Sequence, residues 1–175
     1  VTLGRRFLVG RTPPRAPALN NAFIETDSVG EPNELEYVRI LAVEPGVTAV
    51  VTTLPAPFDS FELAGGEDII LDAPRDFEIL SSERISVLQI LPSQGATGIA
   101  SRYPGGDPSI IVVPPLEQYR DNYVFLTPQY YAFDFVTLVA PRGTQMLLDG
   151  NLLTSAQCSV GPADGVARRT DEPQS

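Results

Sequence analysis

Acidic side chains are the most abundant groups in this chain that could do chemistry. Three carboxylate pairs lie a few residues apart in the sequence: Asp72 with Asp76, Glu117 with Asp121, and Asp59 with Glu62. Two carboxylates are enough for a glycosidase if they flank a sugar-binding cleft at about 5–9 Å from each other. The chain has 22 acidic residues among 175, so pairs at this spacing also arise without function. We therefore expect these carboxylates to be non-catalytic.

Several residue types needed for other chemistry are absent from the sequence. It contains no His, no Lys and a single Cys, Cys158. Without His there is no Ser-His-Asp triad and no imidazole ligand, and without Lys there is no Schiff base. One Cys cannot build a thiolate zinc site or an internal disulfide. Cys158 is therefore expected to be either a buried free thiol or half of a disulfide to a partner outside this sequence.

Two loops rich in Asp and Gly supply oxygen atoms of the kind that bind calcium. They are Asp72-Ala73-Pro74-Arg75-Asp76 and Gly105-Gly106-Asp107-Pro108. Neither matches an EF-hand loop or a calcium-binding nonapeptide repeat. Solvated turns are the favoured interpretation, because Asp-Pro and Gly initiate turns. The sequence predicts no cofactor and leaves only weak calcium binding open.

A local group of tyrosines is the strongest candidate for a binding site. Such rings either stack on sugars or anchor a protein interface. The aromatic residues on predicted strands (Tyr123, Phe125, Phe133 and Phe135) are expected to fill a core instead. The candidate binding residues are Tyr130, Tyr131, Tyr119, Arg120 and Asp121.

The charge balance limits the classes of partner. The net charge is −10 and the isoelectric point is near 4.3. Nucleic acids and anionic membrane surfaces attract clustered cationic side chains, which this chain lacks. There is also no run of 18 apolar residues that would predict a membrane-spanning helix. We expect no nucleic-acid partner and no membrane insertion.

The elements that must position these residues are predicted to be strands. Pro and Gly interrupt nearly every stretch and no window shows a sustained helical period, whereas alternating apolar residues recur between turn signals. Three hairpins are predicted, with turns at Glu44–Gly46, Ala64–Gly66 and Ser81–Arg84, and an earlier strand covers 6–9. The segment 13–17 is expected to be extended by its prolines. The fold class is therefore all-β, built from antiparallel sandwich units with little or no helix.

A Gly- and Pro-rich loop at residues 92–108 is the predicted boundary between two units, 1–100 and 101–175. Strands resume at 109–113, 123–126, 133–140 and 144–148, with a helical turn at 116–121 and a tight turn at 149–151. The segment 37–42 resembles 135–140, which suggests two related sandwiches, the second incomplete. The polar residues from 164 onward are expected to form a tail, or to lead into further domains.

The strand-and-turn motifs in the second half carry a family resemblance. Gly105-Gly106-Asp107-Pro108-Ser109, Val113-Pro114-Pro115-Leu116-Glu117-Gln118-Tyr119-Arg120, Tyr123-Val124-Phe125-Leu126-Thr127-Pro128 and Tyr131-Ala132-Phe133-Asp134-Phe135 resemble the IgGFc-binding protein N-terminal domain family. Leu54-Pro55-Ala56-Pro57-Phe58-Asp59 and Phe61-Glu62-Leu63 resemble its upstream half. The likeness covers about residues 4–164. It is closest to the bacterial version, found in large secreted or surface proteins of myxobacteria.

The resemblance implies an extracellular β-sandwich module without enzymatic activity, secreted or displayed at the cell surface. Its expected role is structural or adhesive, with a surface protein, a polysaccharide or a further copy of itself as partner. Two alternatives stay open: a carbohydrate-binding or glycan-active sandwich, and a jelly-roll subunit of a capsid or surface appendage. The family carries no catalytic or metal residues to assign here.

Overall fold

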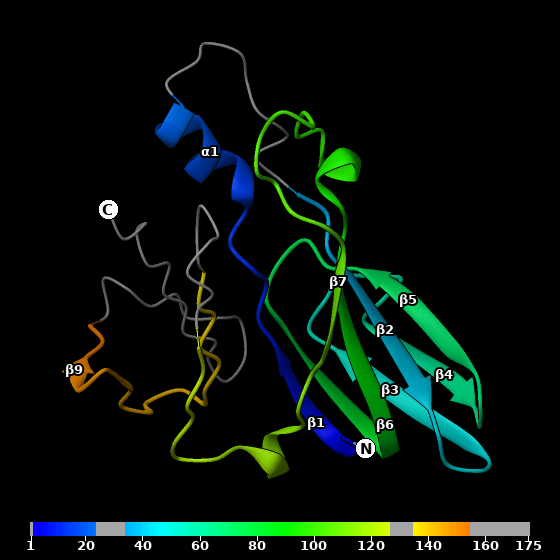
Figure 1. The fold of residues 1–175 in the computed structure, drawn as a ribbon. Coiled ribbons are helices and arrows are strands. Elements are labelled where there is room, and N and C mark those ends of the chain that lie inside the picture. Colours follow the sequence, from blue (N-terminus) through cyan, green and yellow to red (C-terminus); the bar gives the residue numbers. More distant parts are fainter. Residues whose placement is uncertain (1, 24–33, 127–134, 155–175) are drawn as a thin grey trace.

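The computed structural model describes residues 2–23, 34–126 and 135–154, and strands dominate it. The strands are β1 (Gly4–Val9), β2 (Tyr37–Ala42), β3 (Val47–Thr52), β4 (Ser60–Ala64), β5 (Asp68–Asp72), β6 (Phe77–Leu91), β7 (Ser109–Val112), β8 (Leu147–Leu148) and β9 (Asn151–Leu152). The helices are α1 (Arg15–Phe23) and the 3₁₀ turns η1 (Gln94–Thr97) and η2 (Leu116–Gln118). Figure 1 shows α1 above one large curled sheet. The all-β prediction is confirmed.

The large sheet is organised around β6, which is 15 residues long. The first half of β6 pairs with β1 on one edge and β3 on the other, and its second half pairs with β7 and β2. All pairings are antiparallel, and β4 and β5 extend the sheet beyond β3 and β2. β1 stays paired across a register shift, with Arg6 opposite Leu80 and Gly4 opposite Ile85. The predicted hairpin at Ser81–Arg84 is therefore wrong, because these residues bulge within one strand that has partners on both edges.

The other two predicted hairpins are also wrong, although their strands are correct. β2 pairs with β5 and β6, and β3 pairs with β4 and β6, so β2 and β3 follow one another along the same edge of β6. β4 and β5 follow one another in the same way. The pairings divide the large sheet into two half-sheets: β1, β3, β4 and the first half of β6 form one, and β2, β5, β7 and the second half of β6 form the other. The turns at Glu44–Gly46 and Ala64–Gly66 are corners at which the chain passes from one half-sheet to the other. Pro and Gly permit a change of direction, but the choice between reversal and corner depends on distant strands.

The corners lie against one another. Gly65 donates its backbone N–H to the Gly46 carbonyl at 2.8 Å. A Cβ atom at Gly65 would lie 2.4 Å from the Glu44 carbonyl oxygen, so this contact requires glycine. Arg84, in the β6 bulge, forms a 2.6 Å ion pair with the Glu44 side chain. The three bends therefore stack, and the sheet curls along one line.

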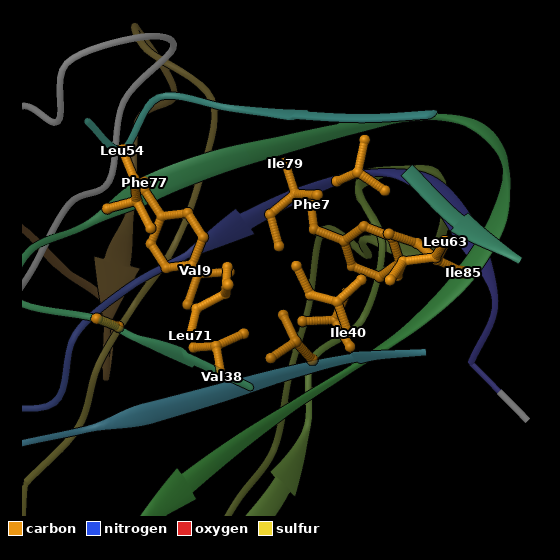
Figure 2. Close-up of a cluster of buried hydrophobic side chains, with 14 of the residues drawn as sticks. Phe7, Val9, Val38, Ile40, Leu54, Leu63, Leu71, Phe77, Ile79 and Ile85 are labelled. Atoms are coloured by element: carbon orange, nitrogen blue, oxygen red, sulfur yellow. The ribbon is translucent and has the colours of Figure 1, made fainter. Parts of the chain in front are cut away.

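The concave side of this curl holds the hydrophobic core. Burial alternates along β2, since Val38, Ile40 and Ala42 are fully buried and Arg39 is exposed. Figure 2 shows apolar side chains from both half-sheets meeting between layers of strands. The core residues are Phe7, Val9, Val38, Ile40, Ala42, Val50, Leu54, Leu63, Leu71, Ala73, Phe77, Ile79, Ile85, Val87 and Val113. A single core thus unites strands from residue 7 to residue 113.

Helix α1 and the loop at 92–108 form a smaller packing unit. The expectation of an extended 13–17 segment is wrong, because the helix begins at Arg15. Pro17 is tolerated in its first turn, where a backbone N–H has no helical partner. Leu19 packs with Ile99 and Tyr103 of the loop. The loop is therefore packed against the first predicted unit, and β7 beyond it belongs to the large sheet. The division into two sandwich units stays a prediction.

Residues 113–126 and 135–154 carry few regular elements. The predicted helical turn is confirmed as η2, and the predicted tight turn joins β8 to β9 with Asp149 and Gly150 at positive φ. Strands were also predicted at 123–126 and 133–140, and in the described residues of these segments no ladder forms. Val124 and Leu126 are more than 90% exposed. Strand-forming residues alone do not make a strand, because an isolated strand lacks hydrogen-bond partners.

Candidate binding surface

Two carboxylates just before β2 form a buried polar junction that the sequence did not indicate. Glu34 and Glu36 are only 7% and 3% exposed. Glu34 accepts hydrogen bonds from Arg15 Nε at 2.8 Å and from the Ala16 backbone N–H at 2.7 Å, so it also satisfies a free donor at the start of α1. Arg15 donates in addition to the carbonyls of Gly105 (2.7 Å) and Pro92 (3.1 Å). Glu34 and Arg15 thus join the helix, β2 and the 92–108 loop.

Glu36, which follows Glu34 and Leu35 in the chain, performs a similar role. Its carboxylate accepts hydrogen bonds from the Thr12 backbone N–H at 2.9 Å and from the Thr12 hydroxyl. Gln89 Nε2 donates to the same carboxylate at 3.1 Å and to the Gly10 carbonyl at 2.9 Å. Both carboxylates are therefore engaged by this chain's own donors, which makes the junction structural.

Burial raises the pKa of Glu36 above its ordinary value of 4.5, although its hydrogen bonds from Thr12 and Gln89 and the charge of Arg11 act in the opposite direction. The folded state therefore holds the proton more tightly than the unfolded chain does. The stabilising contribution of Glu36 is complete below pH 4.5 and is lost as the pH rises through the folded pKa.

We expect the free energy of unfolding of the wild type, minus that of Glu36→Gln, to fall as the pH rises above 4.5. Chemical denaturation at several pH values measures this difference. The matched control is Glu83→Gln, because Glu83 pairs with Arg5 on the exposed surface. A difference for Glu36→Gln that is independent of pH, or that rises with pH, contradicts the assignment.

The convex side of the sheet carries an apolar surface. Residues of β7, β6, β2 and β5 that alternate with core residues point outward here, and cross-strand pairing places them in rows. Ile110, Val112 and Ile70 are 67%, 47% and 53% exposed. We call this surface the outer apolar face: Ile110 and Val112 of β7, Leu88 and Ile90 of β6, Tyr37 and Leu41 of β2, and Ile70 of β5. Contiguous exposed apolar surface of this kind marks interaction sites.

One border of the outer apolar face is an open strand edge. Among the described residues β7 pairs with β6 only, and all four of its residues are exposed. Its neighbour along the same edge of β6 differs, because Phe7, Leu8 and Val9 of β1 are buried. An exposed edge strand without charged side chains offers its backbone groups to another strand. The face and the edge together form the candidate binding surface.

A comparison with known protein families identifies the family of this chain. The family model described as IgGFc binding protein matches residues 2–168. The chain belongs to the IgGFc binding protein family. No curated protein and no solved structure matches the chain.

The match to the IgGFc binding protein family confirms the resemblance seen in the sequence motifs, and it covers the whole large sheet, including β7 and the outer apolar face. A bacterial origin stays a prediction. In the described part of the chain, no helix is long and apolar enough to span a membrane.

The structure describes only part of the tyrosine site that was predicted from the sequence. Tyr130, Tyr131 and Cys158 lie outside the described residues. Tyr119 follows η2 and is half-buried, and burial raises its pKa to about 12. Arg120 and Asp121 are exposed, and the Arg120 backbone N–H donates to the Tyr123 hydroxyl at 2.9 Å. The structure thus brings Tyr119, Arg120 and Tyr123 into one turn, and their role in binding stays a prediction.

The acidic loops considered for calcium have identifiable neighbours. Asp76 Oδ1 accepts the Arg11 backbone N–H at 2.7 Å, and Gly105 is held by the Gln94 side chain at 3.0 Å. Among the described residues, no three acidic or Cys side chains gather in a way that would hold a metal ion. Of the predicted carboxylate pairs, Glu117 accepts the Arg5 backbone N–H at 3.4 Å.

Proposed function

We propose that this chain is an extracellular or cell-surface binding module without enzymatic activity, and that it engages a protein partner through the outer apolar face. Membership of a binding-protein family supports the general role. The observation that carries the assignment of the site is the row Ile70–Arg39–Leu88–Val112, which crosses four strands on the exposed side. Apolar side chains next to an exposed Arg are typical of the centres of protein interfaces.

The chemistry of the described acids supports a role without catalysis. The most buried carboxylates, Glu34, Glu36 and Glu78, are each hydrogen-bonded to donors of this chain, so their oxygen atoms serve to hold the fold together. Arg39 forms a two-point ion pair with Asp68 at 2.8 and 2.9 Å, which fixes a planar polar group beside Ile70. A partner surface would meet apolar side chains with the fixed Arg39–Asp68 ion pair among them.

Binding to immobilised immunoglobulin Fc, a mucin glycoprotein and a glycan array tests this proposal. We expect saturable binding to a protein probe, weakened about tenfold by Ile70→Ser, since one well-packed apolar contact contributes that much in typical interfaces. Val51→Ser is the matched control, because Val51 is also 53% exposed but lies on β3, in the other half-sheet.

Each other outcome points to a rival function. Binding to glycans alone, unchanged by Ile70→Ser, favours a lectin and overturns the proposal, as does turnover of a glycan, which requires an enzyme. Regular particles or filaments under the electron microscope, with no binding to any probe, favour a capsid or appendage subunit.

A further inference from the structure

The β7 edge has a feature that its exposure alone does not explain. The segment Pro108-Ser109-Ile110-Ile111-Val112-Val113-Pro114 has proline at each end, at equal distances from Ile111, and the β-branched residues Ile110 and Val112 flank Ile111. An antiparallel pair of identical strands related by a two-fold axis places residues at equal distances from the centre opposite one another. The sequence of β7 is therefore compatible with pairing to itself.

The orientation of the backbone favours the same register. Val113 donates its N–H to the Val87 carbonyl at 3.0 Å, so Val113 and, by alternation, Ile111 and Ser109 direct their backbone groups toward β6. Ile110 and Val112 then direct their N–H and C=O groups away from the sheet. Among the described residues, none accepts from or donates to these outward groups. They are the groups that a further strand would bind.

We propose that two copies of this chain pair antiparallel through β7, with Ile111 on the two-fold axis. Ile110 then faces Val112 of the second copy, and the two exchange both of their backbone hydrogen bonds; symmetry repeats this pair on the other side of the axis. Pro108 faces Pro114 of the second copy, so the residues that lack an N–H oppose each other where pairing ends. The sheets of the two copies become continuous.

The charge distribution is consistent with a second copy as the occupant. No side chain between Pro108 and Pro114 is charged, so no like charges face each other in this register. Each copy as a whole carries a net charge of −10, which opposes approach at long range. Pairing should therefore strengthen as salt screens this repulsion.

Self-pairing at β7 is separable from partner binding at Ile70, because β6 and β2 lie between β7 and β5. It adds a property to the proposed module: the outer apolar face continues across the axis, and each dimer presents two copies of it. Two linked faces raise the avidity for a repetitive partner surface.

Disulfide trapping on a Cys158→Ser background tests the register directly. Ile111→Cys places two thiols opposite each other in a non-hydrogen-bonded pair, where the Cα atoms lie about 4.5 Å apart, within the range of a disulfide. We expect a covalent dimer for Ile111→Cys and at least tenfold less for Ile110→Cys, because residue 110 faces residue 112 across the axis. Equal yields from both variants, or none from either, overturn the proposal.

Sedimentation at about 0.05 M and about 0.5 M NaCl measures the equilibrium without a crosslink. We expect a monomer–dimer equilibrium that is tighter at the higher salt concentration. Ile110→Pro should remain folded, since its N–H faces away from β6, and should be monomeric, because the proline removes a donor from each symmetric pair. A wild type that is monomeric at all concentrations, or a folded Ile110→Pro that still dimerises, contradicts the pairing. Val51→Ser should dimerise like the wild type. Disulfide trapping and sedimentation both measure self-pairing without a protein probe, so their outcome is independent of the test of the proposed function.

Discussion

Replacing Glu34 with alanine is expected to lower the free energy of unfolding by about 3–5 kcal/mol, the cost of removing one partner from a buried ion pair. Arg15 and Glu34 have side chains that are only 17% and 8% exposed, and they lie 2.8 Å apart. After the substitution, Arg15 keeps its two carbonyl acceptors but no counter-charge, and the Ala16 N–H at the start of α1 loses its acceptor. Urea denaturation followed by circular dichroism measures the change.

The exposed pair Arg5–Glu83 provides the comparison. Its separation of 2.7 Å is nearly the same, but its side chains are 55% and 46% exposed. Glu83→Ala should cost less than about 1 kcal/mol, because water solvates both charges once they separate. Equal costs for Glu34→Ala and Glu83→Ala would show that burial of the junction is not what gives Glu34 its effect.

Replacing Phe7 with alanine is expected to cost about 3–5 kcal/mol, the range for truncating a buried aromatic side chain. Phe7 is fully buried in β1, which pairs with β6, and its ring lies among residues of both half-sheets in Figure 2. The cavity therefore affects both half-sheets together. Thermal unfolding should remain a single transition at a lower temperature.

Val51→Ala is the control for Phe7→Ala, since it shortens a side chain that is 53% exposed on a neighbouring strand. Its expected cost is within about 0.5–1 kcal/mol. Two separate transitions in Phe7→Ala, with only one of them shifted, would show that the half-sheets have independent cores.

Local patterns predicted the strands of this fold well. In β2 the alternation of Val38 and Ile40 with Tyr37 and Arg39 separates two faces, because a strand has a period of two residues, and the structure buries the first of them. The pairing between strands could not be predicted from the same information. Gly46 and Gly65 indicate a change of chain direction, but only the position of β6 decides that the chain turns a corner there.

The candidate site was less predictable than the strands. Glu34 and Glu36 resemble the polar flank of a strand, and their burial depends on Arg15, Thr12 and Gln89, which are 19 to 53 residues away in the chain. The apolar run of β7 is typical of a strand with both faces buried, whereas its exposure follows from its place at the edge of the sheet. The tyrosines at 130 and 131 were visible as a sequence cluster, and they lie outside the described residues.

The pairing of strands that are distant in the chain also affects how fast this protein folds. β3 and β4 pair across the short segment 53–59, but the ladder between β1 and β6 pairs residues as far apart in the chain as Arg6 and Leu80. Chains dominated by such distant pairings fold in milliseconds to seconds rather than microseconds, since a large loop must close before contacts stabilise it. During synthesis, β1 is made before β6 and cannot form this ladder until β6 has followed it. The large sheet is therefore completed only after β6 and β7 have been made.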